Sequence, residues 1–442
     1  RGICTHDNGE CIITGWFQNT MTFNGGPVLT SEGYSDIFLA RYTTDGTLLW
    51  TKSVGGANTD VGNDICALPG GGFAVTGCFG DTVEFGPGET LTSPVNSLFV
   101  AEYSATGDLE WVVSVAAING GLEGKSICAL PDEGVAVTGH FSGTAVFGAG
   151  EPNETTLVSM GNNIFVAKYD KTGSFLWARS AGSTYSNGGY GICAASNGGV
   201  AVTGYFTGAA VFGEPDNQET LSCNGDHDIF VAKYTDNGDF LWAKSAGGTG
   251  NDLGLALCEH PDKTISVTGW FNGTAVFGAG EQNETELVTP PQTSCSFVAR
   301  YGENGVLEWA KNTGDTGLHS GKDICVHNDG SSVLLTGYAN VGGGSLIMKY
   351  TSNGTCEWEQ TTSSGEGTGI STFSDGTFAM SGNTQVGVYV ARYGVSTPTP
   401  TPTPLTLKVN YQPEPLPTPH GFAIKDAGLP VVPLLSEIGR AH

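Results

Sequence analysis

Short apolar runs separated by turn residues recur along the whole chain. The clearest case is residues 228–247, where two apolar runs flank the dipeptide Asn237-Gly238. Asn-Gly between apolar runs predicts a β-hairpin, because a type I′ turn requires positive φ at both central residues. Related hairpins occur at five other places, so the sequence predicts a protein built from one repeated unit.

The two-residue turn also predicts which residues face each other across the hairpin. Counting outward from Asn237-Gly238 places Lys233 opposite Trp242. The same count places Arg41 opposite Trp50, Glu102 opposite Trp111, Lys168 opposite Trp177, Arg300 opposite Trp309 and Lys349 opposite Trp358. Directly opposed residues have Cβ atoms about 5 Å apart. We therefore predict a repeated cation–π contact of structural character, with Glu102 as the exception.

A second signature precedes each hairpin: a strand, a turn, and a strand that ends in Thr-Gly or Ser-Gly. Its copies end at Gly15, Gly77, Gly139, Gly204, Gly269, Gly337 and Gly382. Each full repeat thus holds four strands, which we label a, b, c and d in chain order. Seven copies of four strands favour an all-β, seven-bladed β-propeller. A solenoid is the alternative, but it would need polar capping repeats that the sequence does not show.

The motifs 228–234, 240–242 and 191–204 resemble the SBBP-type repeats of seven-bladed propellers found in bacterial exported and surface proteins. The resemblance covers residues 2–394. It implies a secreted or cell-surface location. It does not imply one activity, because propellers carry many unrelated functions.

The chain divides into four segments. Residues 1–395 form the propeller, whose last copy has strand c but no strand d. Residues 396–404 form an extended Thr-Pro linker. Residues 405–436 are a truncated tail or the start of a further domain, and 437–442 resemble a sequencing artefact.

The last copy lacks an outer strand, and an unpaired sheet edge invites a partner strand. Three sources would fill it: sequence upstream of Arg1, which we favour, the tail segment 405–411, or the same segment of another molecule.

The net charge of the chain disfavours some classes of binding partner. The chain has 18 Lys and Arg against 44 Asp and Glu, a formal net charge of -26. Such a surface repels nucleic acid and anionic membranes. The sequence has no run of 18 apolar residues, so no membrane-spanning helix is expected.

The positions of the cysteines indicate buried structural thiols rather than disulfides or metal ligands. Six of the eleven cysteines occupy one repeat position in strand a, namely Cys4, Cys66, Cys128, Cys193, Cys258 and Cys325. This arrangement favours small buried thiols over disulfides. Since no Cys-x-x-Cys pair occurs, a zinc site is not expected.

The connection between strands b and c differs among the copies. The first five copies carry an extra hairpin there, and the last two replace it with a short turn. One face of the ring is therefore expected to be raised over five blades, and we predict that this decorated face binds the ligand. Aromatic residues that follow Thr-Gly, with two on a neighbouring loop, are the candidate contacts: Trp16, His140, Tyr205, Trp270, Tyr338, Tyr185 and Tyr190. Packing between blades is the alternative role.

Acidic residues of the d–a connections are the candidate metal ligands. They are Asp60, Asp64, Asp252, Asp315 and Asp323. Carboxylates suit calcium, although the same residues are ordinary turn formers. We predict no cofactor, with calcium as the metal these residues would hold.

The sequence shows no catalytic constellation in a suitable context. We therefore predict a non-catalytic extracellular binding or adhesion propeller that recognises a protein or a polysaccharide. One alternative is a structural subunit that self-associates by strand exchange through its tail. The other is a polysaccharide-degrading enzyme, with Asp60, Asp64 and Asp323 converging near the ring axis.

Overall fold

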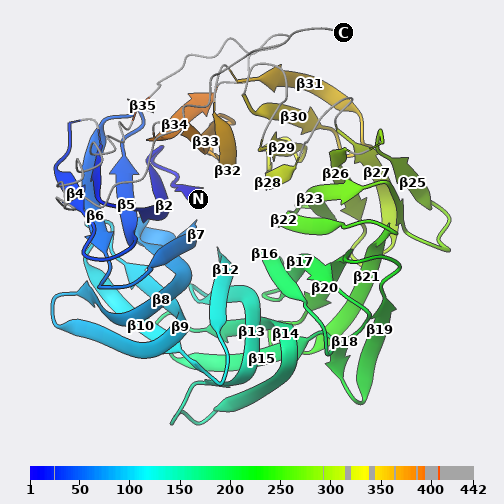
Figure 1. Cartoon of the computed structure of the whole chain (residues 1–442). Helices are drawn as coiled ribbons and strands as arrows, with labels where there is room; N and C mark the ends of the chain where they lie inside the picture. The colour runs from blue at the N-terminus through cyan, green and yellow to red at the C-terminus, as the bar shows by residue number, and fades with distance from the viewer. Residues whose placement is uncertain are drawn as a thin grey trace, which may run out of the picture. The chain divides into compact units, whose positions relative to one another are not determined.

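The computed structural model describes residues 1–23, 25–291, 293–313, 320–337, 344–362, 365–384, 387–393 and 407–408. The described residues of the unit Arg1–Gln412 form a ring of β-sheets around a central opening (Figure 1). Their helical content is one 3₁₀ turn, Pro69–Gly71. The predicted all-β propeller is therefore confirmed as a fold class.

Six four-stranded blades follow one another with the same strand order, a-b-c-d from the centre outward. Their strands are β1 (Ile3–Thr5), β2 (Cys11–Phe17), β5 (Asp36–Tyr42) and β6 (Leu48–Val54); β7 (Val61–Ala67), β8 (Phe73–Gly86), β9 (Glu89–Tyr103) and β10 (Leu109–Val115); β12 (Leu122–Ala129), β13 (Val135–Phe147), β14 (Thr155–Tyr169) and β15 (Phe175–Ala181); β16 (Gly188–Ala194), β17 (Val200–Phe206), β20 (Asp228–Tyr234) and β21 (Phe240–Gly248); β22 (Leu253–Glu259), β23 (Ile265–Asn272), β26 (Ser294–Tyr301) and β27 (Leu307–Asn312); β28 (Gly321–Val326), β29 (Ser332–Thr336), β30 (Leu346–Tyr350) and β31 (Cys356–Thr361).

A further sheet contains β32 (Glu366–Thr372), β33 (Phe378–Thr384), β34 (Gly387–Tyr393) and β35 (Leu407–Lys408). The Thr5 hydroxyl of the first blade donates to the Thr372 carbonyl oxygen at 2.7 Å. At the other side, the Ile370 amide donates to Asp323 at 2.8 Å. This sheet therefore contacts both the first and the sixth blade. The tail strand β35 pairs antiparallel with β34 at Tyr389↔Lys408 and Val390↔Leu407.

The extra b–c hairpins of the first five blades are present. They comprise β3 (Thr20–Thr22) with β4 (Val28–Thr30), the outer halves of β8 with β9 and of β13 with β14, β18 (Ala209–Glu214) with β19 (Asn217–Ser222), and β24 (Thr274–Phe277) with β25 (Thr285–Val288). Several of them also pair with the preceding blade, as β24 does with β21 at Ala246↔Phe277. Likewise β11 (Ala117–Ile118), which follows the second blade, pairs with β13 of the third. Each such hairpin therefore joins its own blade to the neighbouring blade by backbone hydrogen bonds.

Strand c is buried on both faces, as its unbroken apolar pattern predicts. All seven residues of β5 and all seven of β20 are buried. Each sheet lies between two others, so both faces of its middle strands lack solvent.

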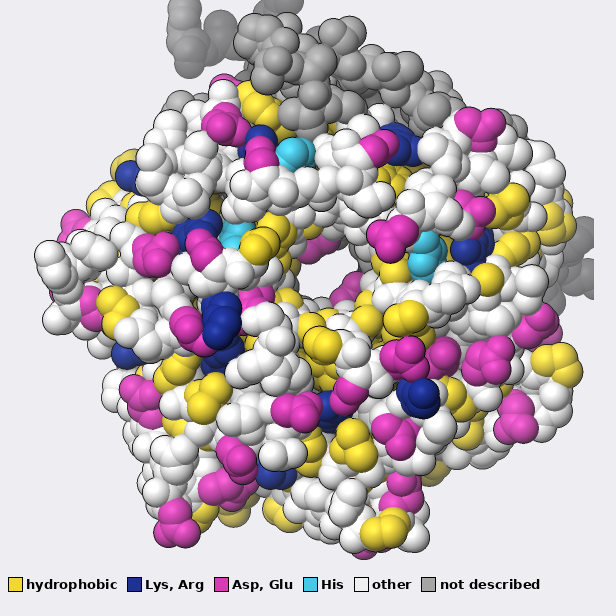
Figure 2. All heavy atoms as spheres, turned by 180° about the vertical axis from the view of Figure 1, so that it is seen from behind, with side chains coloured by type: hydrophobic (Ala, Val, Ile, Leu, Met, Phe, Trp, Pro, Cys, Tyr) yellow, Lys and Arg dark blue, Asp and Glu magenta, His cyan; other side chains and the backbone are white. Residues whose placement is uncertain are grey.

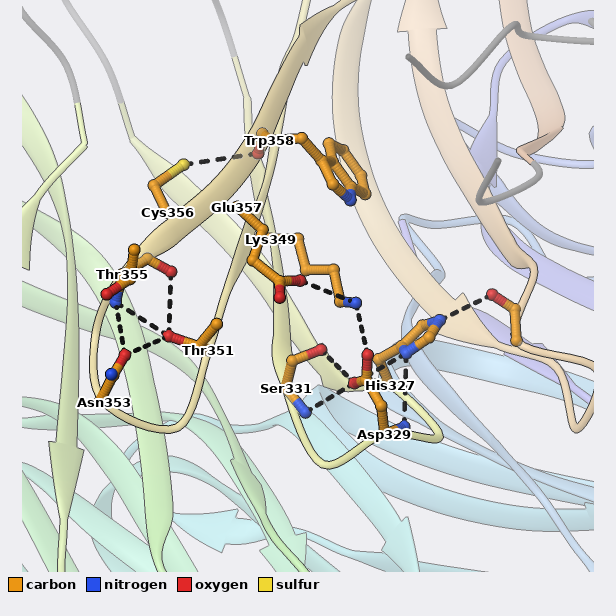
Figure 3. A network of polar contacts seen from close by, with 11 residues as sticks. His327, Asp329, Ser331, Lys349, Thr351, Asn353, Thr355, Cys356, Glu357 and Trp358 are labelled. Atoms are coloured by element: carbon orange, nitrogen blue, oxygen red, sulfur yellow. Dashed lines mark hydrogen bonds and ion pairs between the residues drawn. The ribbon is translucent and has the colours of Figure 1, made fainter. Parts of the chain in front are cut away.

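The predicted pairing is confirmed at all six hairpins, from Arg41↔Trp50 to Lys349↔Trp358. The predicted two-residue type I′ turn is wrong, because Gly238 has positive φ but Asn237 does not, and the register shifts beside the turn. The predicted cation–π contacts are wrong. Figure 3 shows why in the sixth blade: Lys349 reaches Asp329 and Glu357, while the Trp358 ring points away from it. A buried ammonium gains more from a charge-assisted bond to a carboxylate than from a ring face.

The same arrangement recurs around the ring. Lys168 lies 2.7 Å from Asp132, Arg300 lies 2.6 Å from Asp262, and Arg41 lies 2.6 Å from Glu10. These carboxylates come from a–b turns. The tryptophans instead reach across to the next blade, as when Trp177 Nε1 donates to the Asp236 carbonyl oxygen at 2.8 Å.

The repeated strand-a cysteines are thiols rather than half-cystines, as predicted. No disulfide joins Cys4, Cys66, Cys128, Cys193 and Cys258. Burial raises the pKa of each thiol, for Cys193 to about 12. At neutral pH these side chains therefore pack as small apolar groups.

Candidate binding site at the mouth of the central channel

The innermost strands surround the central opening, which passes through the ring in the space-filling view (Figure 2). Six of them carry a β-bulge at the same place, where the register shifts after a glycine. The extra residues are Asn63, Lys125, Tyr190, Leu255, Lys322 and Thr368, which we call the bulge ring. Bulges re-aim side chains. One backbone feature thus presents five kinds of side chain at six equivalent places of the inner wall, with lysine occurring twice.

In five of the six strands, the glycine before the bulge is required by close packing against a threonine of the preceding blade. A Cβ on Gly124 would lie 2.2 Å from Thr76 Oγ1, and one on Gly189 would lie 2.3 Å from Thr138 Oγ1. These threonines belong to the Thr-Gly signature, and Thr76 Oγ1 donates to the Phe99 carbonyl oxygen at 2.9 Å. The packing constrains the glycine and the threonine, whereas the bulged residue varies between blades.

A charged group lies on the second and third blades. Glu123 accepts a bond from Asn63 Nδ2 at 2.8 Å and pairs with Lys125 Nζ at 2.6 Å. Burial acts to raise the pKa of Glu123, but Lys125, Asn63 and His140 outweigh it, and this pKa lies below its usual value. Burial and Lys125 lower the pKa of His140, which favours its neutral form. The group therefore holds one ion pair beside a neutral imidazole.

An aromatic group continues from this ion pair into the fourth blade. Lys125 Nζ lies 5.8 Å from the ring centre of Tyr190, and Tyr190 lies 5.9 Å from Tyr205. Tyr205 meets His227 edge-on at 4.6 Å, and His227 Nδ1 lies 2.6 Å from Asn251 Oδ1. Burial raises the pKa of Tyr190 to about 12, so its phenol keeps its proton at neutral pH. The rings are half-buried, which leaves surface for a ligand.

The structure brings together three of the predicted ligand residues, His140, Tyr190 and Tyr205. Tyr185 is 62% exposed and lies beside Gly208 on the neighbouring b–c hairpin. Trp16 and Trp270 occupy the equivalent positions of the first and fifth blades, and the ring contacts found among the described residues do not join them to this group. Tyr338 lies outside the described residues.

Sequence reasoning missed Asn63, Glu123, Lys125, His227 and Lys322. The signal available for the bulged ones was the glycine that stands three residues before each Ile-Cys or Leu-Cys pair, as in Gly62 and Gly124. The residue after that glycine is the bulged one. A linear sequence gives no sign that this residue is left unpaired.

The predicted metal ligands do not share one site. Asp60 accepts the amides of Gly56 at 2.8 Å and Gly80 at 3.1 Å, and Asp252 accepts those of Gly248 at 2.8 Å and Asn272 at 3.0 Å. Both are buried and tie a d–a loop to the next blade. Asp315 lies outside the described residues.

Asp64 and Asp323 lie instead on the inner strands. Asp64 accepts the Ser126 hydroxyl at 2.7 Å and the Ile127 amide at 3.0 Å, and Asp323 has the same role toward Ile370. Burial raises the pKa of Asp323 to about 7, with a further contribution from the charge of Asp64. The prediction that Asp60 converges with these two residues near the ring axis is wrong, because Asp60 belongs to a loop and not to the inner wall. Among the described residues no three His, Cys, Asp or Glu side chains form a metal-binding group.

No family model matches the chain, so the resemblance to SBBP-type repeats stays a prediction. The uncharacterized WD repeat-containing protein L264 of Acanthamoeba polyphaga mimivirus is 24% identical over 433 residues, covering 80% of this chain and 31% of that protein. The regulatory protein FlaEY of Caulobacter vibrioides is 34% identical over 108 residues, covering 24% of this chain and 11% of that protein. The chain thus spans less than a third of either relative.

Two solved structures illustrate the structural similarity. A protein from Lactobacillus plantarum has a TM-score of 0.46 at 11% identity, covering 91% of this chain and 100% of that one. The Dos1 propeller has a TM-score of 0.41 at 9% identity, covering 89% and 91%. Within the described residues, no helix has the length and apolar character needed to cross a membrane.

Proposed function

We propose that this protein is a non-catalytic binding propeller whose site is the channel mouth on the face of the b–c and d–a connections. We call this the upper face. The observation that carries the proposal is the bulge ring, in which six strands with the same backbone geometry present Asn, Lys, Tyr, Leu, Lys and Thr in turn. Variation on a fixed scaffold is what recognition requires, whereas purely structural positions repeat.

The ligand we propose is a protein or a polysaccharide. Half-buried tyrosines combine an apolar ring with a hydroxyl, which suits either partner. A net charge of -26 opposes nucleic acid as a ligand. The secreted or surface location and an adhesive role rest on the resemblance to SBBP-type repeats.

Binding is tested by screening the full chain against immobilised glycans and extracellular proteins. For any ligand found, Tyr205→Ala and Lys125→Ala are expected to weaken binding at least tenfold. Tyr34→Ala is the matched control, because Tyr34 is 73% exposed on a loop of the first blade. Equal binding by all three variants would place the ligand elsewhere and refute this site.

The alternative of a polysaccharide-degrading enzyme requires two carboxylates that face a substrate. Asp64 and Asp323 instead accept backbone amides of the next blade. We therefore retain the non-catalytic proposal. We also propose that no metal is needed, so that a chelator leaves Tm unchanged; a drop in Tm that calcium restores would contradict this.

A structural role through the tail is the second candidate, and the pairing of β35 with β34 favours it. We propose that the ring has seven blades, the last of which is completed by this tail strand. In solution the strand would come from the same chain or from a second copy.

A further inference from the structure

A hollow lies between the first two blades on the opposite, lower face, where the a–b and c–d turns gather. It has a volume of about 740 Å³, within the usual range of ~300–1,000 Å³ for small-ligand sites. The a–b turns of both blades and the c–d turn of the second blade line it. None of these residues belongs to the channel mouth.

His6 lies in the wall of this hollow with an unused ring nitrogen. Its side chain is 8% exposed, and Nε2 has no hydrogen-bond partner among the described residues. A buried polar atom left unsatisfied costs free energy. Since Nε2 is shielded from solvent, a ligand in the hollow would remove that cost once the imidazole ring turns toward it.

Equivalent histidines at two other blade boundaries show what His6 lacks. His260 Nδ1 lies 3.0 Å from the Gly330 carbonyl oxygen, and His327 Nε2 lies 2.9 Å from that of Gly376. Both carbonyls belong to the a–b turn of the next blade. At the first boundary the matching carbonyl, that of Gly71, accepts Arg41 Nη1 at 2.8 Å instead. The arginine thus leaves the histidine unpartnered.

The wall contains one neutralised ion pair, Arg41 with Glu10, and the carboxylate of Asp7, which has no ion-pair partner among the described residues. Arg41 bonds to Glu10 through Nε and Nη2, and its Nη1 also donates to the Ala105 carbonyl oxygen at 2.8 Å. Each nitrogen of the guanidinium group therefore already has a protein acceptor. Burial and Arg41 also lower the pKa of His6, which supports a neutral imidazole. Because the Asp7 carboxylate repels an anion, the hollow fits an uncharged ligand better than an anionic one.

The hollow also has an apolar side. Leu68 and Pro69 line it, and Leu49 at its edge is 46% exposed. A hollow of about 510 Å³ between the fourth and fifth blades repeats this arrangement with Leu241, which is 44% exposed. The a–b turn beside that second hollow has Ala195 at the position that corresponds to His6. The histidine is thus what distinguishes the two.

We propose that the hollow between the first two blades binds a neutral sugar, with His6 Nε2 bonding a hydroxyl and the leucine side contacting the ring. A hydroxyl both donates and accepts, so it matches a neutral imidazole in either tautomer. The C–H face of a sugar ring matches the leucines.

The test is a titration of the full chain with neutral cello-, laminari-, malto- and xylo-pentaose, and with trigalacturonate as the anionic probe. We expect at least one neutral probe to bind one site per chain and to shift the ring nitrogen signals of His6 in ¹⁵N-histidine spectra. His6→Leu is expected to weaken this binding at least tenfold. This variant is compatible with the fold, because Leu68 and Leu130 occupy the same turn position in the next two blades.

His327→Leu and Tyr34→Ala are the controls and are expected to leave this binding unchanged. The proposal is overturned if no neutral probe moves the His6 signals, if His6→Leu binds as tightly as the natural chain, or if trigalacturonate binds equally well. Loss of binding in Tyr205→Ala alone would place the sugar at the channel mouth and would also overturn it.

Discussion

The strand-c cations of this propeller show how burial decides a side chain's partner. Lys233 Nζ lies 3.0 Å from Glu259 Oε1, and the two side chains are 3% and 6% exposed. In such a site each charge depends on the other for solvation. A register rule finds the residue opposite, Trp242, but not the carboxylate that arrives from the next blade.

Breaking this pair is expected to be costly. Lys233→Met leaves Glu259 buried and unpaired, so urea unfolding should show a loss of about 3–5 kcal/mol. Lys171→Met is the control, because Lys171 and Glu133 are 64% and 53% exposed, and its cost should be at most ~1 kcal/mol. Similar losses in the two variants would show that burial does not set the value of the pair.

The glycine before each bulge provides a second prediction at this scale. Gly124→Ala would place a methyl group 2.2 Å from Thr76 Oγ1 and 2.6 Å from Leu98 Cδ1. We expect a loss of roughly 1–3 kcal/mol in urea unfolding. Gly121→Ala has open space around the new methyl group and should be neutral or slightly stabilising. Equal effects would contradict the packing argument.

Blade boundaries are the next scale, and two of them hold paired buried aspartates. Asp36 with Asp60, and Asp228 with Asp252, occupy the positions that Asn163 and Asn187 occupy in the third blade. Asn187 Nδ2 donates to Asn163 Oδ1 at 3.1 Å. In the aspartate pairs, Asp36 Oδ1 and Asp228 Oδ1 have no partner among the described residues. A proton on one carboxyl would restore the bond that the amide makes.

The free energy of unfolding should therefore fall as the pH rises from the unfolded pKa to the folded pKa of these carboxyl groups. Burial raises the pKa of Asp252 to about 7, with a contribution from Asp228, and the neighbouring His227 acts in the opposite direction on Asp228. The folded chain holds this proton more tightly than the unfolded chain. The resulting stability is complete below the unfolded pKa of about 3.9 and is lost as pH rises through about 7.

Thermal unfolding between pH 5 and 8 checks this prediction. Asp252→Asn should flatten the decline in Tm, by an amount equivalent to at least roughly 1.4 kcal/mol at pH 8. Asn187→Asp should introduce the same decline at a boundary that lacks it. An unchanged profile in both variants would show that these pairs do not titrate.

Much of this architecture could be predicted from the sequence, because it depends on local rules. The Asn-Gly signal at 237–238 located the hairpin and its Lys233↔Trp242 pair, although the turn is closed by the Gly238 amide on the Thr235 carbonyl oxygen and is not of type I′. Buried runs such as 229–234 identified sheets covered on both faces. The residues of the candidate binding site could be predicted only in part. Tyr190 and Tyr205 stood out as aromatics, whereas Lys125 and Glu123 became visible only once the bulge and the neighbouring blade were known. Contacts between blades join residues some 60 positions apart, as with Asn63 and Glu123, and no local pattern encodes them.

At the scale of the whole molecule, the question is how the last sheet is completed. β34 has β33 on one side and the two-residue β35 on the other. Without β35, one edge of β34 would expose unpaired backbone groups, and such edges promote association.

Deleting residues 395–442 is therefore expected to lower Tm, and adding a peptide of sequence 405–411 should restore it. Light scattering of the full chain distinguishes the two sources of the strand. A size independent of concentration indicates pairing within one chain, and concentration-dependent growth that the deletion abolishes indicates strand exchange. An unchanged Tm after deletion would show that the tail does not complete the sheet.

Some b–c hairpins pair with the preceding blade. One repeat of the sequence is therefore not the unit that would fold by itself. A segment cut from strand a to strand d, such as 188–248, would leave behind β24, which covers its outer strand β21. It would also lose the next c–d turn, on which Trp242 packs through Gly305. A segment extended to include the following hairpin and turn would keep both contacts. Gain or loss of a blade by duplication or deletion should therefore be tolerated best when the break lies beyond these overlapping elements, out of phase with the repeat.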